Sequence, residues 1–155
     1  MKFLERNTLS QIEKEQIIGL WNREYPQNLR YEKPEQFEAY LNGLKDQYHI
    51  LIVDDNENII GWYFDFIREE ERWFAAIIDS EFQGKGLGTN LLNLARKQRK
   101  ELNGWVIPSA DYVKCNGSPY RSPLEFYKKN GFEIYNDVKL ETDKIRAIKI
   151  KWSSE

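Results

Sequence analysis

The stretch from Asp79 to Lys100, DSEFQGKGLGTNLLNLARKQRK, places three glycines and one lysine directly before a helical pattern. The apolar run WFAAII precedes it, so the local order is strand, glycine-rich loop, helix. The first turn of a helix leaves backbone N–H groups without partners and carries about half a positive elementary charge, so it binds anions. Glycines at 84, 86 and 88 lack the Cβ atoms that would hold a ligand away from the backbone. The stretch therefore predicts a phosphate or pyrophosphate site.

Two other nucleotide-binding loops fit this stretch poorly. A P-loop has the pattern G-x-x-x-x-G-K-S/T, whereas Lys85 lies between the first two glycines and Thr89 follows a glycine. A dinucleotide-binding Rossmann loop has the pattern G-x-G-x-x-G, whereas the spacing here is G-x-G-x-G and hairpin strands precede it. The remaining alternative is a turn that holds no ligand. Since each glycine costs about 1 kcal/mol relative to alanine in a helix, three of them together favour a ligand.

The composition of the chain is that of one globular domain. Its 155 residues suffice for one core, and we expect a single domain over residues 1–155. The hydrophobic content of 41% is too high for a disordered chain. The net charge of −2 gives no overall attraction to nucleic acid or to an anionic membrane, so we expect neither as a partner.

Cysteine and histidine usage excludes two further classes of site. Cys115 is the single cysteine, so no disulfide forms within the chain, and with His49 as the single histidine we expect no metal site. The N-terminal MKFLERNTLS lacks an apolar leader, and no apolar run reaches transmembrane length. We therefore expect a cytoplasmic protein.

The first half of the chain reads as a strand, two helices and a hairpin. Residues 2–6 predict the strand, and Thr8 with Gln11 has the spacing of a capping box that starts the first helix. The second helix starts near Pro34 and weakens at Gly43. The runs HILIV and IIGWYFDFI, separated by DDNEN, then predict two paired strands.

The second half alternates helices and strands. An apolar stripe that includes Leu87 and Leu102 predicts a helix after the glycine loop, ended by Asn103 and Gly104, and WVI then starts a strand. Ser122, Pro123 and Glu125 predict a capped helix that stops at Gly131, and FEIY and DKIRAIKIKW predict two final strands. The predicted order is βααβββαβαββ, which favours a mixed sheet in an α/β or α+β fold.

Two motifs resemble those of the GNAT N-acetyltransferase superfamily. Gln83, Gly86 and Gly88 match its pattern Q/R-x-x-G-x-G/A, and SPLEFYKKNGFEI resembles its A-x-x-F-Y-x-x-x-G-F segment. The family's usual proline before the loop is replaced by Ser80. Motifs and element order together cover the chain from about Ile59 to its end. The resemblance implies a mixed, mostly antiparallel sheet of about seven strands flanked by about four helices.

The resemblance also implies a co-substrate, acetyl-CoA, and an acetyl transfer to an amine. The pantetheine arm would lie along the strand residues Ala76, Ile77 and Ile78. The pyrophosphate would lie on the loop that consists of Gln83, Gly84, Lys85, Gly86, Leu87, Gly88 and Thr89. Basic side chains at Lys85, Arg96 or Lys97 would meet phosphate charge, although a solvent-exposed helix face explains them equally well. Asn116 is a further expected cofactor contact.

Acyl transfer needs a proton donor for the leaving thiolate and a route for the amine proton. Tyr127 lies where the family motif places a tyrosine acid, although its spacing also suits a core aromatic residue. Asp111 is the expected base, with Asp65 and Asp79 as alternatives. Many family members have an asparagine seven residues before the tyrosine, where this chain has Tyr120.

We expect the acceptor side to be built from the first two helices and the neighbouring strands. Its aromatic candidates are Trp21, Tyr25, Tyr31, Tyr40, Trp62 and Phe64. Such residues line apolar or cation-binding slots, and they also form cores. The acceptor is expected to be a small-molecule or peptide amine, and the protein a monomer or homodimer. The alternatives are a GNAT-like module that binds acyl-CoA without turnover and, from a different class, a dinucleotide-dependent hydride transferase.

Overall fold

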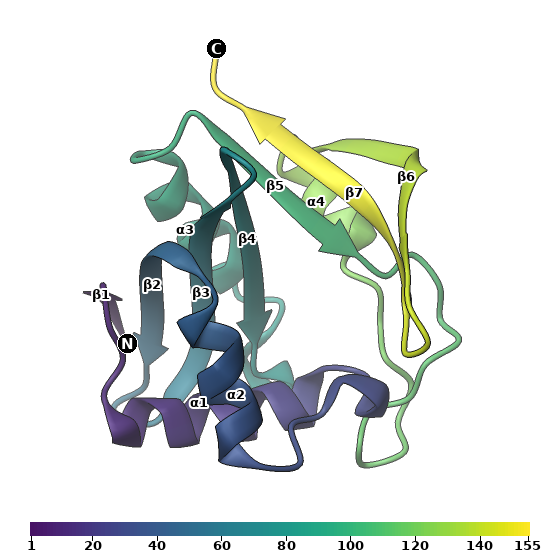
Figure 1. Ribbon diagram of the computed structural model, residues 1–155. Helices are drawn as coiled ribbons and strands as arrows, with labels where there is room; N and C mark the ends of the chain where they lie inside the picture. Colours follow the sequence, from purple (N-terminus) through teal and green to yellow (C-terminus); the bar gives the residue numbers. More distant parts are fainter.

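The computed structural model describes all residues from Met1 to Glu155 as a seven-stranded sheet flanked by four α-helices (Figure 1). The strands are β1 (Lys2–Arg6), β2 (Lys45–Val53), β3 (Ile59–Arg68), β4 (Glu71–Ile78), β5 (Glu101–Val106), β6 (Glu133–Glu141) and β7 (Arg146–Ser153). The helices are α1 (Gln11–Glu24), α2 (Pro34–Asn42), α3 (Leu87–Arg96) and α4 (Leu124–Lys129), with short 3-10 turns η1 (Gln27–Leu29) and η2 (Ser80–Phe82). The predicted element order is confirmed.

The sheet consists of two antiparallel parts that meet at one point. The strand order is β1-β2-β3-β4-β5-β7-β6, and every neighbouring pair is antiparallel except β4 and β5. These two strands run parallel and pair only at Trp73 and Asn103. Figure 1 shows them diverging from this shared end. The divergence leaves one edge of β4 open beyond Trp73.

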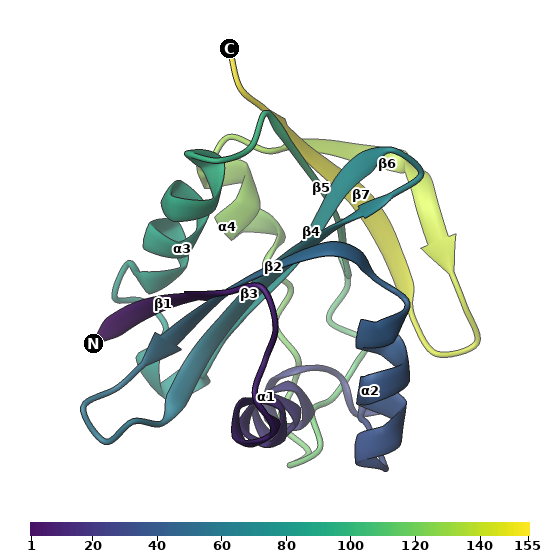
Figure 2. The same ribbon diagram turned by 60° about the vertical axis from the view of Figure 1, so that its left-hand side comes forward.

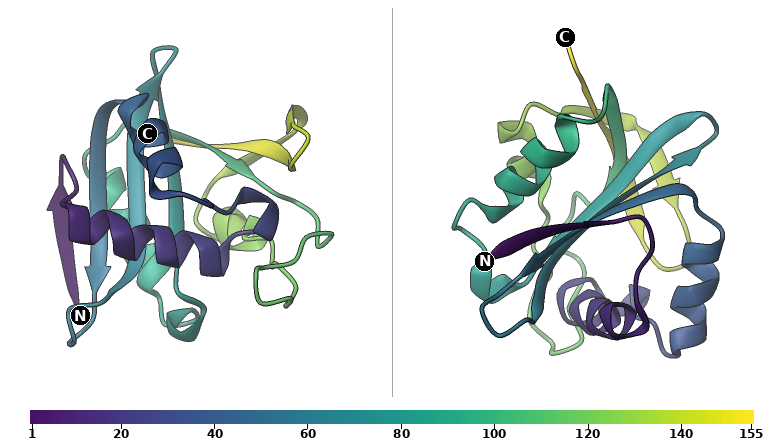
Figure 3. Two further views of the ribbon diagram at one scale, coloured as in Figure 1. Left: turned by 60° about the horizontal axis from the view of Figure 1, so that its bottom comes forward. Right: turned by 90° about the vertical axis from the view of Figure 1, so that its left-hand side faces the viewer.

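Two helices cover each face of the sheet (Figure 2). Alternation along β3 sends Tyr63 to the face of α3 and α4, and Trp62 and Phe64 to the face of α1 and α2. All three side chains have no exposed surface. Helix α1 runs across the strands of the first half of the sheet (Figure 3). Each face therefore has its own hydrophobic core.

The predicted caps of the first helix and of the last differ from those in the structure. Helix α1 is capped by Ser10 and Glu13, whose side chains each accept a backbone N–H of the other, so the prediction of Thr8 and Gln11 is wrong. The same capping-box spacing occurs twice in this stretch, and Glu13 supplies the charged acceptor. At α4, Pro123 is the N-cap, and Glu125 pairs with Lys128 instead of closing a box.

The predicted end of the third helix is also wrong. Helix α3 ends at Arg96, and Leu102, Asn103 and Gly104 belong to β5. Leu102 lies in β5 and is buried in the same core as the apolar side of α3. Its match to the helical spacing is therefore a coincidence. The side chain of Asn103 donates to the Arg72 carbonyl oxygen on β4 at 3.1 Å. Asn103 thus holds the two strands together instead of ending a helix.

Candidate active site

The glycine loop presents a continuous run of free backbone donors. The Gln83 N–H donates to the Ser80 carbonyl oxygen at 3.4 Å, and the Asn90 N–H donates to that of Gly86 at 3.0 Å. Between them, the N–H groups from Gly84 to Thr89 have no hydrogen-bond partner within the protein. They lie at the N-terminus of α3, where the helix dipole adds a positive potential. This loop can therefore hold an anionic group that has several oxygens.

Two of the three glycines shape this loop, and the third has another function. Gly84 and Gly86 have φ values of +79° and +82°, a region that only glycine adopts readily, and a Cβ on either would meet nothing within 4 Å. A Cβ on Gly88 would lie 2.8 Å from the ring of Phe126. Gly88 therefore allows α3 to pack closely against α4, which corrects the interpretation that all three glycines make room for a ligand.

The open edge of β4 adds a second set of backbone groups. The Asp79 N–H donates to the Ile60 carbonyl oxygen at 2.8 Å. In an antiparallel pair every second residue directs its backbone N–H and C=O to the same neighbour, so Ile77, two residues before Asp79, also directs these groups to β3. Ala76 and Ile78 consequently turn their N–H and C=O groups to the opposite edge, where β5 no longer pairs. The Gln83 side chain donates to the Ile78 carbonyl oxygen at 2.9 Å, which fixes the loop to the end of the strand.

A buried carboxylate anchors the same loop from the other side. Glu24, at the end of α1 and 7% exposed, accepts the Ser80 N–H at 2.9 Å and pairs with the Lys114 ammonium at 3.0 Å. One side chain thus ties α1 to η2 and to the long connection between β5 and α4. A buried ion pair of this kind fixes geometry even where its net contribution to stability is small.

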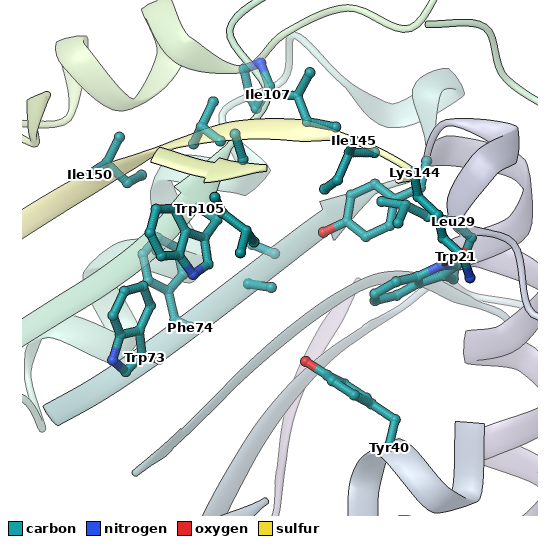
Figure 4. Close-up of a pocket in the computed structure, with 18 of the residues that line it drawn as sticks. Trp21, Leu29, Tyr40, Trp73, Phe74, Trp105, Ile107, Lys144, Ile145 and Ile150 are labelled. Carbon is teal, nitrogen blue, oxygen red and sulfur yellow. Dashed lines mark hydrogen bonds between the residues drawn. The ribbon is translucent and has the colours of Figure 1, made fainter. Parts of the chain in front are cut away.

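A cavity of about 470 Å³ adjoins the gap between β4 and β5 (Figure 4). Trp73 and Phe74 enter it from β4, Trp105 from β5, and Tyr40 reaches toward it from α2 (Figure 4). Of its 25 lining residues, 19 are hydrophobic. The charged lining residues are Arg30, Arg68 and Lys144, and no aspartate or glutamate lines the cavity. The cavity is therefore apolar with a cationic component.

Tyr127 lies between the cavity and the core of the α3–α4 face. Its ring packs edge-on against Phe74 and Phe132, and the residue is 6% exposed. Its hydroxyl makes no hydrogen bond within the protein, while the residue lines the cavity. Burial raises the pKa of Tyr127 above its usual 10, with the neighbouring Tyr120 adding to the effect. The hydroxyl therefore stays protonated and is available as a donor.

The structure does not bring the three aspartates to this cavity. Asp111 is exposed in the connection that follows β5, and Asp79 pairs with Arg23 at 3.2 Å. Asp65 has no exposed surface and binds Arg72 at 3.1 Å, Arg99 at 3.0 Å and the Tyr63 hydroxyl at 2.6 Å. None of them is among the lining residues. None of the three aspartates is therefore placed to contact a substrate in the cavity.

The residue expected to replace the family asparagine also lies elsewhere. Asn116 accepts hydrogen bonds from the backbone N–H and the hydroxyl of Ser118, in an exposed turn outside the cavity. Tyr120 takes the lining position instead, 8% exposed, and burial raises its pKa to about 12. A phenol thus stands where many family members have an amide.

Four of the six predicted acceptor-side aromatics line the cavity, namely Trp21, Tyr25, Tyr31 and Tyr40. Trp62 and Phe64 do not, because they are completely buried beneath α1 and α2. The sequence analysis did not predict Trp73, Trp105 or Lys144 as lining residues. Strand alternation could have indicated the two tryptophans, whereas nothing in the local sequence around Lys144 indicates its position. The last lies beside Ile145 and across from Tyr40 in Figure 4.

Residues 46–134 match the family model described as the acetyltransferase (GNAT) domain, which is more than half of the chain. The chain belongs to the GNAT acetyltransferase family. The matched segment begins in β2 and ends in β6, so it includes the glycine loop, the open edge of β4 and Tyr127. A search of curated protein sequences gave no match.

Solved GNAT structures share the fold along almost the whole chain. An aminoglycoside 6'-N-acetyltransferase complexed with coenzyme A superposes with a TM-score of 0.72 at 16% identity, covering 99% of this chain and 97% of its own. A mutant of the spermidine N-acetyltransferase SpeG from Vibrio cholerae gives 0.67 at 18%, with coverages of 99% and 95%. A phosphinothricin acetyltransferase from Sinorhizobium meliloti in complex with acetyl-CoA gives 0.67 at 12%, with 99% and 89%. At these identities the similarity establishes the fold.

No group of three or more histidine, cysteine, aspartate or glutamate side chains is arranged to hold a metal ion. None of the helices combines the length and the apolar character that crossing a membrane requires.

Proposed function

We propose that the protein is an acetyl-CoA-dependent N-acetyltransferase that moves the acetyl group to a primary amine by direct attack within a ternary complex. The observation that carries this proposal is the run of unpaired backbone N–H groups from Gly84 to Thr89 at the start of α3. It matches the pyrophosphate of coenzyme A in charge and in the number of acceptor oxygens. Membership of the family and the fold shared with coenzyme A complexes support the same ligand.

The remaining parts of acetyl-CoA have complementary groups nearby. The backbone groups of Ala76 and Ile78 on the open edge of β4 are suited to the amides of the pantetheine arm. Gln83 holds the loop to this edge, so that the pyrophosphate and pantetheine sites keep a fixed relation. Lys85 is exposed on the loop and offers charge to a phosphate. The thioester would then reach the cavity where Tyr127 lies.

Acetyl transfer at this site requires one proton donor. The amine nitrogen attacks the thioester carbon, and the C–N bond forms as the carbonyl oxygen takes up negative charge. The C–S bond then breaks, and the Tyr127 hydroxyl donates its proton to the sulfur that receives the electron pair. The proton that the product nitrogen releases restores the tyrosine through water. The free hydroxyl and the raised pKa of Tyr127 suit a group that must arrive protonated.

The amine must lose its own proton without a carboxylate in the cavity. We propose that water in the cavity accepts it, because no aspartate or glutamate lines the wall and Asp111 is exposed elsewhere. A nearby positive charge lowers the pKa of a bound ammonium group, which reduces the cost of this step. Arg30, Arg68 and Lys144 supply such charge.

The proposal is tested by thiol release from acetyl-CoA across a panel of primary amines. A chromogenic disulfide reagent detects the free coenzyme A, and the Cys115→Ser variant removes the protein's exposed thiol from the signal. We expect amine-dependent release above the hydrolysis rate, together with acetylated amine in the mass spectrum. Acetyl-CoA binding without any release would instead identify an acyl-CoA-binding module, and binding of NAD(P) alone would exclude both readings.

A further inference from the structure

The gap between β4 and β5 is closed at one end. The two strands pair at Trp73 and Asn103 and diverge from there toward the glycine loop, which follows Ile78 (Figure 1). A ligand that is bound by the loop and along the open edge of β4 therefore directs its far end toward the closed end. We call the stretch of the gap from Ala76 to the pair at Trp73 its inner end. This stretch is about 10 Å long, since a strand rises about 3.3 Å per residue.

Aromatic side chains bridge the two strands at the inner end, on both faces of the sheet. On the face of α3 and α4, the Phe74 ring lies against Gly104, where a Cβ would be 2.9 Å from the ring. On the face of α1 and α2, the rings of Trp73 and Trp105 stack with their centroids 5.3 Å apart, and Figure 4 shows the two indoles side by side. All four residues line the cavity. The inner end is therefore covered from both sides.

The size of the side chains along β4 changes at Phe74. Ile78, Ala76 and Phe74 point to the same face of the sheet, because side chains alternate along a strand. Ala76 is small and borders the open part of the gap, and Phe74 is the next side chain toward the closed end. Phe74 is 6% exposed, and its ring centroid lies 5.7 Å from that of Tyr127, the proposed proton donor. A thioester sulfur within reach of Tyr127 therefore has the Phe74 ring beside it.

We propose that Phe74, packed against Gly104, limits the length of the acyl group that the donor can carry: acetyl and propionyl groups fit beside the ring, and butyryl and longer groups do not. This inference rests on the proposed function and adds the class of donor to it. The ring does not move aside readily, because it packs against the rings of Tyr63, Tyr127 and Phe132. A longer chain that turned into the cavity instead would occupy the space of the acceptor.

A binding experiment without any amine tests the length limit independently of turnover. Calorimetric titration compares acetyl-CoA, propionyl-CoA, butyryl-CoA and hexanoyl-CoA, with coenzyme A as the reference that has no acyl group. We expect acetyl-CoA and propionyl-CoA to bind with similar affinity, and the two longer donors to bind about tenfold more weakly or worse, since one methylene group too many in a closed apolar pocket costs at least this much. Butyryl-CoA that bound as tightly as acetyl-CoA would overturn the inference.

Variants of the inner end locate the limit. Phe74→Leu removes part of the ring and should raise the ratio of butyryl-CoA to acetyl-CoA affinity by about tenfold. Adding Gly104→Ala fills the vacated space from β5 and should bring the ratio back toward the wild-type value. The matched control Phe37→Leu makes the same change on α2, in the core of the other face and outside the cavity wall, and should keep the wild-type ratio. An unchanged ratio in folded Phe74→Leu, or an equal change in Phe37→Leu, would contradict the assignment to Phe74.

Turnover separates this inference from the proposed function. With the amine that releases most thiol from acetyl-CoA, kcat/KM should fall about tenfold or more from acetyl-CoA to butyryl-CoA, and the fall should be smaller in Phe74→Leu. If the two donors had equal kcat/KM, the length limit would be wrong while the transferase stood. If the donors bound in the expected order but no amine released thiol, the length limit would stand and the transferase would fail. Absence of binding by every donor would refute both.

Discussion

At the scale of single residues, Tyr127 combines a buried ring with a free hydroxyl. A tyrosine whose hydroxyl lacks a hydrogen-bond partner gains no polar contribution to stability from it, so a function in the cavity is the better explanation. Its ring packs against Phe74 and Phe132 and accounts for its apolar part. The two roles are separable, because only the hydroxyl is removed by substitution with phenylalanine.

The Tyr127→Phe variant should lower kcat by about a hundredfold, the usual contribution of a positioned proton donor. Acetyl-CoA affinity and the thermal midpoint should be unchanged, because the ring stays and no hydrogen bond is lost. Steady-state kinetics, calorimetric titration and thermal unfolding measure the three quantities. Tyr135→Phe, at a half-buried tyrosine on β6 that does not line the cavity, is the matched control and should have wild-type kcat. An unchanged kcat in Tyr127→Phe would remove the proposed acid.

Gly88 and Gly84 differ in the reason why each is a glycine. Gly88→Ala should lower the free energy of unfolding by about 1–3 kcal/mol, because its Cβ meets the Phe126 ring at 2.8 Å. The double variant with Phe126→Leu should recover part of that loss. Gly84→Ala should cost about 1 kcal/mol through its left-handed φ alone, with no recovery from Phe126→Leu. Urea denaturation measures the free energy of unfolding of both glycine variants, each with and without Phe126→Leu. Equal recovery by Phe126→Leu in the two cases would contradict the assignment.

At the scale of elements, strand alternation and turn chemistry predicted most of the fold. The β2–β3 hairpin, the start of α2 at Pro34 and the stop of α4 before Gly131 follow from local chemistry, and the structure has them. The end of α3 did not follow, because Leu102 fits a helical stripe and a buried strand equally well. The pairing of Asn103 with Trp73 on β4 shows that this segment is a strand and not the end of a helix. Local spacing cannot predict such a contact between segments that are distant in the sequence.

His49 connects β2 to β3 through a neutral ring. Its Nδ1 accepts the Trp62 indole N–H at 3.0 Å, and its Nε2 lies 3.0 Å from the Gln47 side-chain oxygen. The residue has no exposed surface. Burial lowers the pKa of His49 from 6.5 to about 4. A proton on Nδ1 would face the indole N–H, so the folded state holds the neutral form.

Stability should therefore fall as the pH falls through this range. Below about pH 6.5 the unfolded chain binds a proton at His49, whereas the folded chain does not bind one until about pH 4. The free energy of unfolding therefore falls between these two pH values, and the loss is complete below about pH 4. The total is about 3 kcal/mol. Urea denaturation of wild type and His49→Gln measures it, and the wild type should lose about 2 kcal/mol more between pH 7 and pH 5. Parallel pH profiles would show that His49 does not titrate in this way.

At the scale of the whole molecule, the site exists because the sheet is divided. Strand β5 pairs with β7 along its length but with β4 at one position only, so a gap opens between the two parts. The glycine loop lies at the end of β4, and the cavity adjoins the gap. Glu24 and Asn28 then fix distant loops to the acceptor side. No single segment contains the site.

This division explains which parts of the site were predictable. The glycine loop and Tyr127 lie in contiguous motifs, so the sequence indicated them directly. The cavity wall comes from residues between Trp21 and Ile150, and neither Lys144 nor Arg68 belongs to a motif. Asp111 and Asn116 are predictions from position along the chain, and both residues are exposed in the connection between β5 and α4, outside the cavity. Residues that only the tertiary structure brings to the cavity cannot be predicted from their spacing in the sequence.

The most direct test of the central claim is a titration of the isotope-labelled protein with coenzyme A, followed by the backbone amide resonances in NMR spectra. We predict that the largest shifts fall on the N–H groups from Gly84 to Thr89, where no partner within the protein competes. Inorganic pyrophosphate alone should move the same resonances by a smaller amount. Absence of binding, or shifts confined to residues outside this loop and β4, would contradict the account.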